Sequence, residues 1–125
     1  MAKILIIDDQ ESMRTIISHM LLDRGHEVLI AEDGEEGLTL FNESPNSFTL
    51  VVADVNMPKI DGFELLQKIK TAQPKMPVVL ITGMTEEIVK VVSQEEIKPD
   101  AIIKKPFIVD EALEIIEKFS KISAN

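Results

Sequence analysis

The strongest constraint on the fold is an alternation between short β-branched apolar runs and longer segments with helical spacing. The apolar runs lie at 4–7, 28–31, 50–53, 78–81 and 101–103. They are nearly continuous in apolar character, which is typical of strands covered on both faces. Between them, apolar residues recur at helical spacing: Met13, Ile16, Ile17, Met20 and Leu21; Leu38 and Phe41; Phe63, Leu66 and Ile69; Ile88, Val91 and Val92; Leu113, Ile116 and Phe119.

This alternation predicts an α/β fold with a five-stranded parallel sheet and five helices on both of its faces. Consecutive parallel strands need crossover connections, and helices provide them. Gly25 is expected to end the first helix, and 43–47 is expected to be a surface loop. Because no repeat, low-complexity stretch or linker divides the sequence, residues 1–125 are expected to form a single domain.

Composition excludes several classes of function. The net charge of −9 argues against binding to nucleic acid or to an anionic membrane surface. The absence of cysteine excludes disulfides and thiolate chemistry. No stretch has the length of a membrane span or the layout of a signal peptide, so we expect a cytoplasmic protein. No glycine-rich nucleotide-binding motif is present.

Polar residues with chemical potential follow four of the predicted strands. In an open parallel sheet the carboxyl ends of the strands meet at one edge, where ligands bind. If the strands are parallel and adjacent, three carboxylates, a hydroxyl and a lysine converge there. The residues at these strand ends are Asp8 and Asp9; Asp54; Thr82 and Gly83; Lys104, Lys105 and Pro106.

These residue types indicate a magnesium-assisted phosphoryl acceptor. Crowded carboxylates repel one another unless a cation or proton compensates them. Oxygen ligands without cysteine favour a hard ion, above all Mg²⁺, with Mn²⁺ as an alternative. A carboxylate oxygen of Asp54 would be the nucleophile and form an acyl phosphate. The ion, a lysine ammonium and the Thr82 hydroxyl would neutralise the phosphoryl oxygens.

Each residue taken alone also has a simpler structural interpretation. Asp8 and Asp9 would favour the start of the first helix, and Asp54 would cap a turn. Thr82 would end a strand, and Lys105 would be a solvated surface lysine. The combination at four strand ends favours the functional interpretation.

At these residues the sequence resembles the receiver domain of bacterial response regulators, in particular the single-domain regulators of the chemotaxis type. Four segments, in order and at strand ends, carry the resemblance: Asp8-Asp9, 54–62 (DVNMPKIDG), Thr82-Gly83 and Lys105-Pro106-Phe107. The resemblance covers essentially the whole chain. It implies a flavodoxin-like sheet with strand order 2-1-3-4-5.

The resemblance also implies roles for individual residues. Asp54 would accept the phosphoryl group; Asp9 and Asp54 would bind Mg²⁺ directly, Asp8 through water, and Asn56 through its backbone carbonyl. Thr82 would move toward the phosphoryl group, and Lys105 would pair with it. The Lys105–Pro106 peptide bond would be cis. The domain would be a signalling switch, not an enzyme beyond its own phosphorylation and dephosphorylation.

The partners implied are a histidine kinase or phosphotransfer protein and an unknown downstream protein. The downstream protein would contact a face built by the fourth helix, fifth strand and fifth helix. One departure from the family is Ile102, which stands where many receivers have an aromatic residue that couples phosphorylation to this face. Met84, beside the phosphoryl site, is expected to favour moderate to slow loss of the phosphoryl group.

Two other functions fit these residues less well. A Mg²⁺-dependent hydrolase of phosphate esters would share the aspartate nucleophile, but Asn56 stands where a second acidic residue would act as acid and base. An interaction domain that works without phosphorylation would not need the complete set of Asp8, Asp9, Asp54, Thr82 and Lys105.

Overall fold

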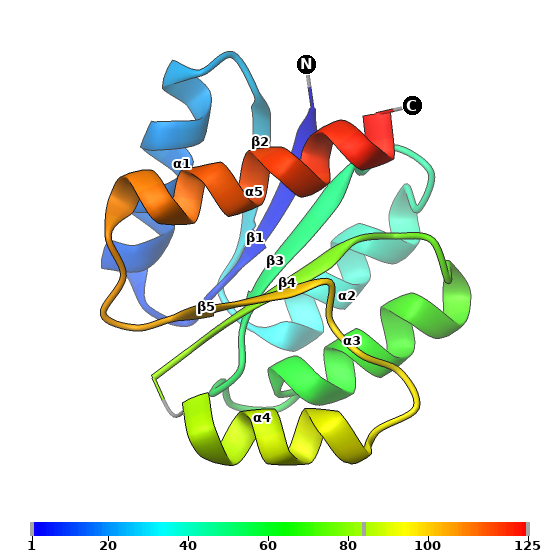
Figure 1. Cartoon of the computed structure of the whole chain (residues 1–125). Coiled ribbons are helices and arrows are strands. Elements are labelled where there is room, and N and C mark those ends of the chain that lie inside the picture. The colour runs from blue at the N-terminus through cyan, green and yellow to red at the C-terminus, as the bar shows by residue number, and fades with distance from the viewer. Residues whose placement is uncertain (1, 84, 125) are drawn as a thin grey trace.

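The computed structural model describes residues 2–83 and 85–124, and its centre is a five-stranded parallel sheet (Figure 1). The strand order β2-β1-β3-β4-β5 confirms the expected topology. Each strand is one residue longer than the apolar run that predicted it. The strands are β1 (Lys3–Ile7), β2 (Glu27–Ala31), β3 (Leu50–Asp54), β4 (Val78–Thr82) and β5 (Ala101–Lys104).

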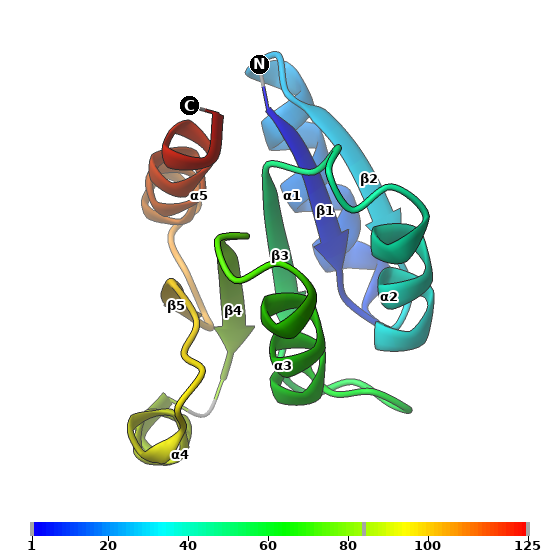
Figure 2. The same cartoon turned by 90° about the vertical axis from the view of Figure 1, so that its right-hand side faces the viewer.

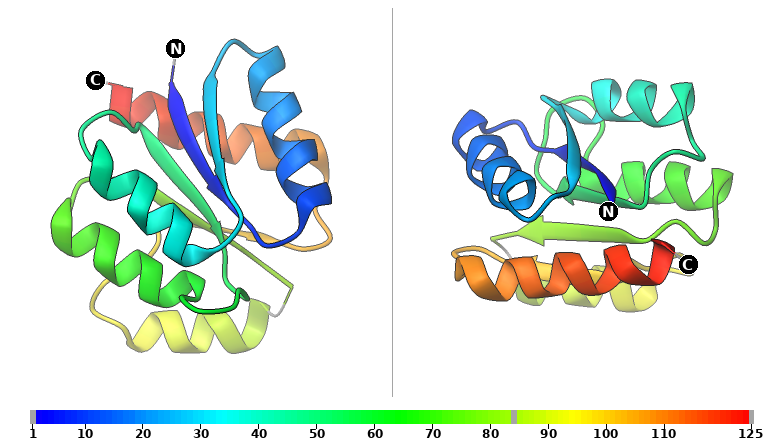
Figure 3. Two further views of the ribbon diagram at one scale, coloured as in Figure 1. Left: turned by 180° about the vertical axis from the view of Figure 1, so that it is seen from behind. Right: turned by 90° about the horizontal axis from the view of Figure 1, so that it is seen from above.

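Five helices cover the two faces of the sheet, as predicted (Figures 2 and 3). One face carries α1 and α5, and the other carries α2, α3 and α4. Within the described ranges, no helix has the combined length and apolar character needed to cross a membrane. The helices are α1 (Glu11–Asp23), α2 (Gly34–Glu43), α3 (Gly62–Ala72), α4 (Thr85–Gln94) and α5 (Val109–Ala124).

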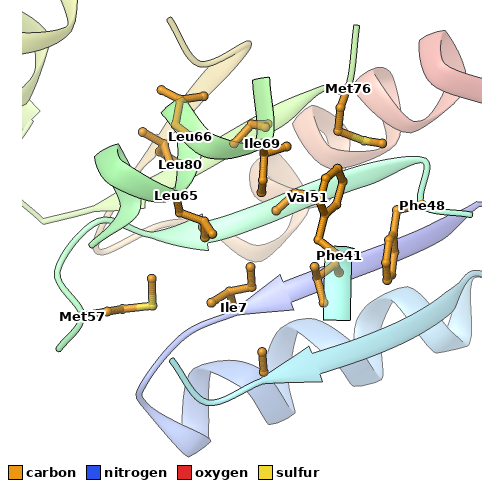
Figure 4. Packing of buried hydrophobic residues seen from close by; sticks show 14 of the residues in the cluster. Ile7, Phe41, Phe48, Val51, Met57, Leu65, Leu66, Ile69, Met76 and Leu80 are labelled. Atoms are coloured by element: carbon orange, nitrogen blue, oxygen red, sulfur yellow. The ribbon is translucent and has the colours of Figure 1, made fainter. Parts of the chain in front are cut away.

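The continuous apolar character of the strands follows from this two-sided cover. Successive side chains of a strand point to opposite faces of the sheet. Ile7 therefore packs on the side of α2 and α3, whereas Ile6 packs on the side of α1 and α5. Figure 4 shows Phe41 of α2 and Leu65 of α3 directed at the strands of the first core. Because a core lies on each face of the sheet, the side chains on both faces of the central strands are buried.

Local signals set several helix ends. The Asp33 side chain accepts a hydrogen bond from the Glu36 amide at the start of α2, and Asp61 does the same for Glu64 in α3. Gly25 follows α1 with a φ of 86°, a conformation that favours glycine. By contrast, no side chain caps the start of α1 at Gln10. The Gln10 amide instead donates a hydrogen bond to Oδ1 of Asp8, two residues earlier.

The predicted apolar stripe of α1 was wrong in part. Ile16 is 46% exposed, whereas Arg14 is only 8% exposed and lies on the buried side with Ile17 and Leu21. These three buried positions are spaced three and four residues apart, so α1 turns a slightly different side to the sheet than the apolar residues alone suggested.

The prediction for α4 also held only in part. Val92 packs against the core, but Val91 is 45% exposed. The side chain of Ile88, which completed the predicted stripe, lies outside the described residues.

Candidate functional site

The register of the sheet places Asp8 beside Asp54. Ile7 of β1 is paired with Ala53 of β3, so the residue that follows each lies at the same level of the sheet. Asp54 is in turn paired with Ile81, which directly precedes Thr82. The predicted convergence of these strand ends is therefore present (Figure 1).

Three carboxylates form one cluster at this edge. Oxygen atoms of Asp8, Asp9 and Asp54 all lie within 4.8 Å of one another. The cluster is asymmetric, because Asp8 and Asp54 are 1% and 5% exposed whereas Asp9 is exposed. Two carboxylates are thus held inside the protein and the third closes the cluster from the solvent side.

Lys105 lies between the two buried carboxylates. Its Nζ is 3.6 Å from Oδ1 of Asp54 and 3.8 Å from Oδ2 of Asp8. The Lys105 amide donates a hydrogen bond to the carbonyl of Thr82, which ties the end of β5 to the end of β4. The Lys105–Pro106 peptide bond is cis, as expected. Lys104, the residue before Lys105, is exposed.

Burial makes both inner carboxyls reluctant to ionise. Loss of solvation is the main cause that raises the pKa of Asp8, and it also raises the pKa of Asp54, where the nearby Asp8 adds to the effect. Lys105 opposes both shifts, and backbone N–H groups do so as well, from Gln10 for Asp8 and from Asn56 for Asp54. One ammonium group therefore compensates the cluster incompletely.

The cluster fits a hard divalent cation. Oδ2 of Asp8 is buried without a hydrogen-bond partner, although buried polar atoms are seldom left unpaired. Asp8 also provides one oxygen to a group of carboxylate oxygens that are close enough to share one ion. All the donors are oxygens, which is the preference of Mg²⁺. The residues present would therefore hold the predicted ion.

The remaining predicted residues surround this cluster. Thr82 is fully buried at the end of β4, and Asn56 is exposed two residues after Asp54. Ile102 is half-buried on β5 and packs against the core on the α2–α3 side. Met84, named above for its effect on the lifetime of the phosphoryl group, lies outside the described residues.

Gly62 forms the floor of the loop that follows Asp54. A Cβ atom at this position would lie 2.7 Å from the Asp54 carbonyl oxygen and 2.7 Å from the Val55 Cα. The Gly62 amide also donates a hydrogen bond to the Val55 carbonyl. Only glycine therefore lets the start of α3 approach the backbone of the site this closely.

Replacing Gly62 with alanine is expected to lower the free energy of unfolding by about 1–3 kcal/mol, because the added methyl group must displace backbone. Urea denaturation followed by far-ultraviolet circular dichroism measures this change. Gly83→Ala is the matched control, since its Cβ meets nothing within 4 Å, and it should change stability by less than about 0.5 kcal/mol. Equal effects of the two variants would contradict this assignment.

Arg14 is a residue of this region that sequence reasoning missed. Its Nη1 donates a 2.7 Å hydrogen bond to the backbone carbonyl of Asp8. A signal was present, because Arg14 stands three residues before Ile17 and seven before Leu21, at the spacing of one buried helix face. A charged residue in such a stripe indicates a specific partner.

Known proteins resemble this chain in sequence over most of its length. Residues 4–117 match the model of the response regulator receiver domain. Over 106 residues the chain is 37% identical to the alkaline phosphatase synthesis transcriptional regulatory protein PhoP of Bacillus subtilis; the match covers 84% of this chain and 42% of that protein. The chain thus spans less than half the length of the curated relatives it matches first.

Solved structures are similar over nearly the whole chain. A response regulator receiver domain protein from Clostridium thermocellum superimposes with a TM-score of 0.88 and 31% identity, covering 99% of this chain and 98% of that one. The response regulator protein TrrA of Thermotoga maritima, solved in complex with Mg²⁺–BeF, has a TM-score of 0.84 and 29% identity, covering 95% and 99%.

Proposed function

The chain belongs to the response regulator receiver domain family, whose members act in phosphorylation-dependent signalling, and from this premise we propose that Asp54 accepts a phosphoryl group. The donor is a histidine kinase or a phosphotransfer protein, and residues 1–125 act as one receiver domain. The observation that carries the proposal is the burial of Asp54 beside Asp8, with the Lys105 ammonium 3.6 Å from its carboxylate.

The reaction is transfer of a phosphoryl group between two nucleophiles. A carboxylate oxygen of Asp54 attacks the phosphorus atom while the bond from phosphorus to the donor imidazole nitrogen breaks. The electron pair of that bond stays on the nitrogen, and the product on the receiver is an acyl phosphate. Such transfers depend mainly on positioning and on neutralising the phosphoryl oxygens.

The residues of the site divide these tasks. Asp8, Asp9 and Asp54, with the backbone carbonyl of Asn56, hold Mg²⁺, which when bound neutralises phosphoryl charge and orients the group. The complex of the relative TrrA with Mg²⁺–BeF supports this choice of ion.

Lys105 and Thr82 serve the phosphoryl group itself. The Lys105 ammonium, now shared between Asp54 and Asp8, pairs with a phosphoryl oxygen once Asp54 has lost its free carboxylate. The hydroxyl of Thr82, one residue along from the partner of Asp54 in β4, binds another oxygen.

The signal leaves through the face formed by α4, β5 and α5. A phosphoryl group adds charge that favours one of two conformations of the domain, and a partner protein reads the change. Thr82 and Lys105 end the neighbouring strands β4 and β5, so a shift at the site reaches β5 directly. Ile102 on β5 transmits this shift without an aromatic ring, and the downstream partner is a protein rather than nucleic acid.

The test is the intact mass of the protein after incubation with acetyl phosphate, a small-molecule donor. One added phosphoryl group is expected in Mg²⁺, and none when a chelator removes the ion, because the buried carboxylates would otherwise repel the incoming anion. Circular dichroism in both conditions establishes that the protein stays folded. An adduct formed equally well in chelator would contradict the metal-assisted mechanism.

A further inference from the structure

Three hydrogen bonds hold Asp8 in place and leave one of its carboxylate oxygens unpaired. Its amide donates to the Ala31 carbonyl, its Oδ1 accepts from the Gln10 amide at 2.9 Å, and its carbonyl accepts from Arg14 at 2.7 Å. The remaining atom, Oδ2, has no hydrogen-bond partner and is 3.8 Å from Nζ of Lys105. These contacts together determine where Oδ2 points.

The contact from Arg14 acts on the peptide group between Asp8 and Asp9. Asp8 is the first residue after β1, and its carbonyl is met by the arginine side chain. Rotation of this peptide group would move the Cα of Asp9 relative to the Asp8 carboxylate, since the group is planar. Holding its oxygen therefore restricts the position of Asp9 relative to the Asp8 carboxylate.

Arg14 is an unfavourable choice for a purely structural position. It is 8% exposed, and its Nε is buried without a hydrogen-bond partner. Within the described part of the chain, the two buried side-chain atoms that lack partners are this Nε and Oδ2 of Asp8. An apolar side chain would fill the space without leaving a donor unpaired. The residue must therefore provide something that an apolar side chain does not.

The charge of Arg14 acts on the Asp8 carboxyl more weakly than other nearby groups do. Among the influences on the pKa of Asp8, Arg14 lowers the value less than the Gln10 amide or Lys105 does. The contact that distinguishes Arg14 is its hydrogen bond to the carbonyl of Asp8.

We propose that Arg14 is a positioning residue of the acidic site, whose hydrogen bond to the Asp8 carbonyl orients the Asp8 and Asp9 carboxylates for binding Mg²⁺. This inference rests on the proposed function and adds to it a residue outside the ligand set. Partners of metal ligands commonly have this effect, because they restrict the ligands to the geometry that the ion needs.

The experiment compares Arg14→Met and Arg14→Lys with wild type. Calorimetric titration of Mg²⁺ suits this chain, which has no Trp or Tyr to report binding by fluorescence. Arg14→Met is expected to raise the Kd for Mg²⁺ about tenfold or more. Arg14→Lys keeps a donor that can approach the carbonyl and should bind Mg²⁺ no more than about threefold more weakly than wild type. Phosphorylation of both variants should recover at saturating Mg²⁺.

Arg24→Met is the matched control. It removes the other arginine of the chain, which follows the end of α1 and pairs with Glu117 across an exposed contact. The change in net charge is the same, but the site is not touched, so the affinity for Mg²⁺ should be unchanged.

A second measurement needs no metal. In amide NMR spectra of the metal-free protein, Arg14→Met should shift the Asp9 and Gln10 resonances and speed hydrogen exchange at Gln10, while Arg14→Lys should restore them. A folded Arg14→Met protein with wild-type affinity and spectra would overturn the inference. So would an Arg14→Lys protein as weak as Arg14→Met. If wild type binds no Mg²⁺, the proposed function fails, and the amide spectra still decide the role of Arg14.

Discussion

Asp54→Asn is expected to reduce phosphorylation by acetyl phosphate to background, since the amide oxygen that remains is a poor nucleophile and no acyl phosphate can form. Asparagine keeps the size and shape of the aspartate side chain. Loss of the adduct would therefore report on chemistry and not on packing. Intact mass after incubation in Mg²⁺ is the measurement.

Asp23→Asn is the control for this variant, because it removes one carboxylate at the exposed end of α1. It should be phosphorylated like wild type. An adduct that persists in Asp54→Asn would place the phosphoryl group elsewhere, and peptide mapping of Asp8 and Asp9 would locate it.

Asp54→Asn should also stabilise the metal-free protein. The Asp54 carboxylate is buried beside Asp8, and both effects raise its pKa. Removing the charge removes the repulsion and the desolvation cost, so the melting temperature should rise by several degrees. This increase also establishes that a lost adduct does not come from unfolding.

The second large effect is a pH dependence of stability that Mg²⁺ reverses. The pKa values of Asp8 and Asp54 lie above the ordinary 3.8 in the folded protein. Between 3.8 and the raised values, the folded state binds more protons than the unfolded state. The free energy of unfolding therefore falls as pH rises through this window. The destabilisation is complete above the folded pKa values and absent below 3.8.

Mg²⁺ acts in the opposite direction because it binds only the ionised cluster of the folded protein. At a free concentration one hundred times its Kd, it should add about 2.7 kcal/mol to the free energy of unfolding at neutral pH. This gain should disappear as acid protonates the carboxyls, since protons compete with the ion.

Urea denaturation at neutral and mildly acidic pH, in Mg²⁺ and in chelator, measures both effects. The net charge of −9 adds a general pH dependence of its own. The informative quantity is therefore the difference in stability between wild type and Asp8→Asn. In chelator, this difference should favour the variant more at neutral than at acidic pH. A difference that does not vary with pH would contradict the raised pKa of Asp8.

Much of the fold followed from residues considered locally. Runs such as 50–53 and 78–81 are apolar throughout, because parallel strands that are buried on both faces need apolar side chains on both faces. Asp61 and Gly25 mark helix boundaries through capping and backbone conformation. The order of the strands came from the resemblance, because periodicity does not state which strands are neighbours.

The approximate site also followed from the sequence, for a topological reason. Parallel strands end at one edge, so Asp8, Asp54 and Lys105 had to converge once the strands were placed side by side. Asp8 and Asp9 are adjacent in the sequence, and nothing in the sequence predicted that Asp8 is buried and Asp9 exposed.

The tertiary structure alone decided how α1 is turned about its axis. No side chain of Gln10 caps its start. Ile16 and Ile17 are equally apolar, but only Ile17 is buried, and Met13 and Met20 pack at the edge of the same core. Packing against the sheet leaves Ile16 in solvent and brings Arg14 to the Asp8 carbonyl. Which groups gather at the strand ends could be predicted from the sequence, because parallel strands all end at the same edge of the sheet. Their burial and partners depend on contacts between segments distant in sequence, which only the folded chain establishes.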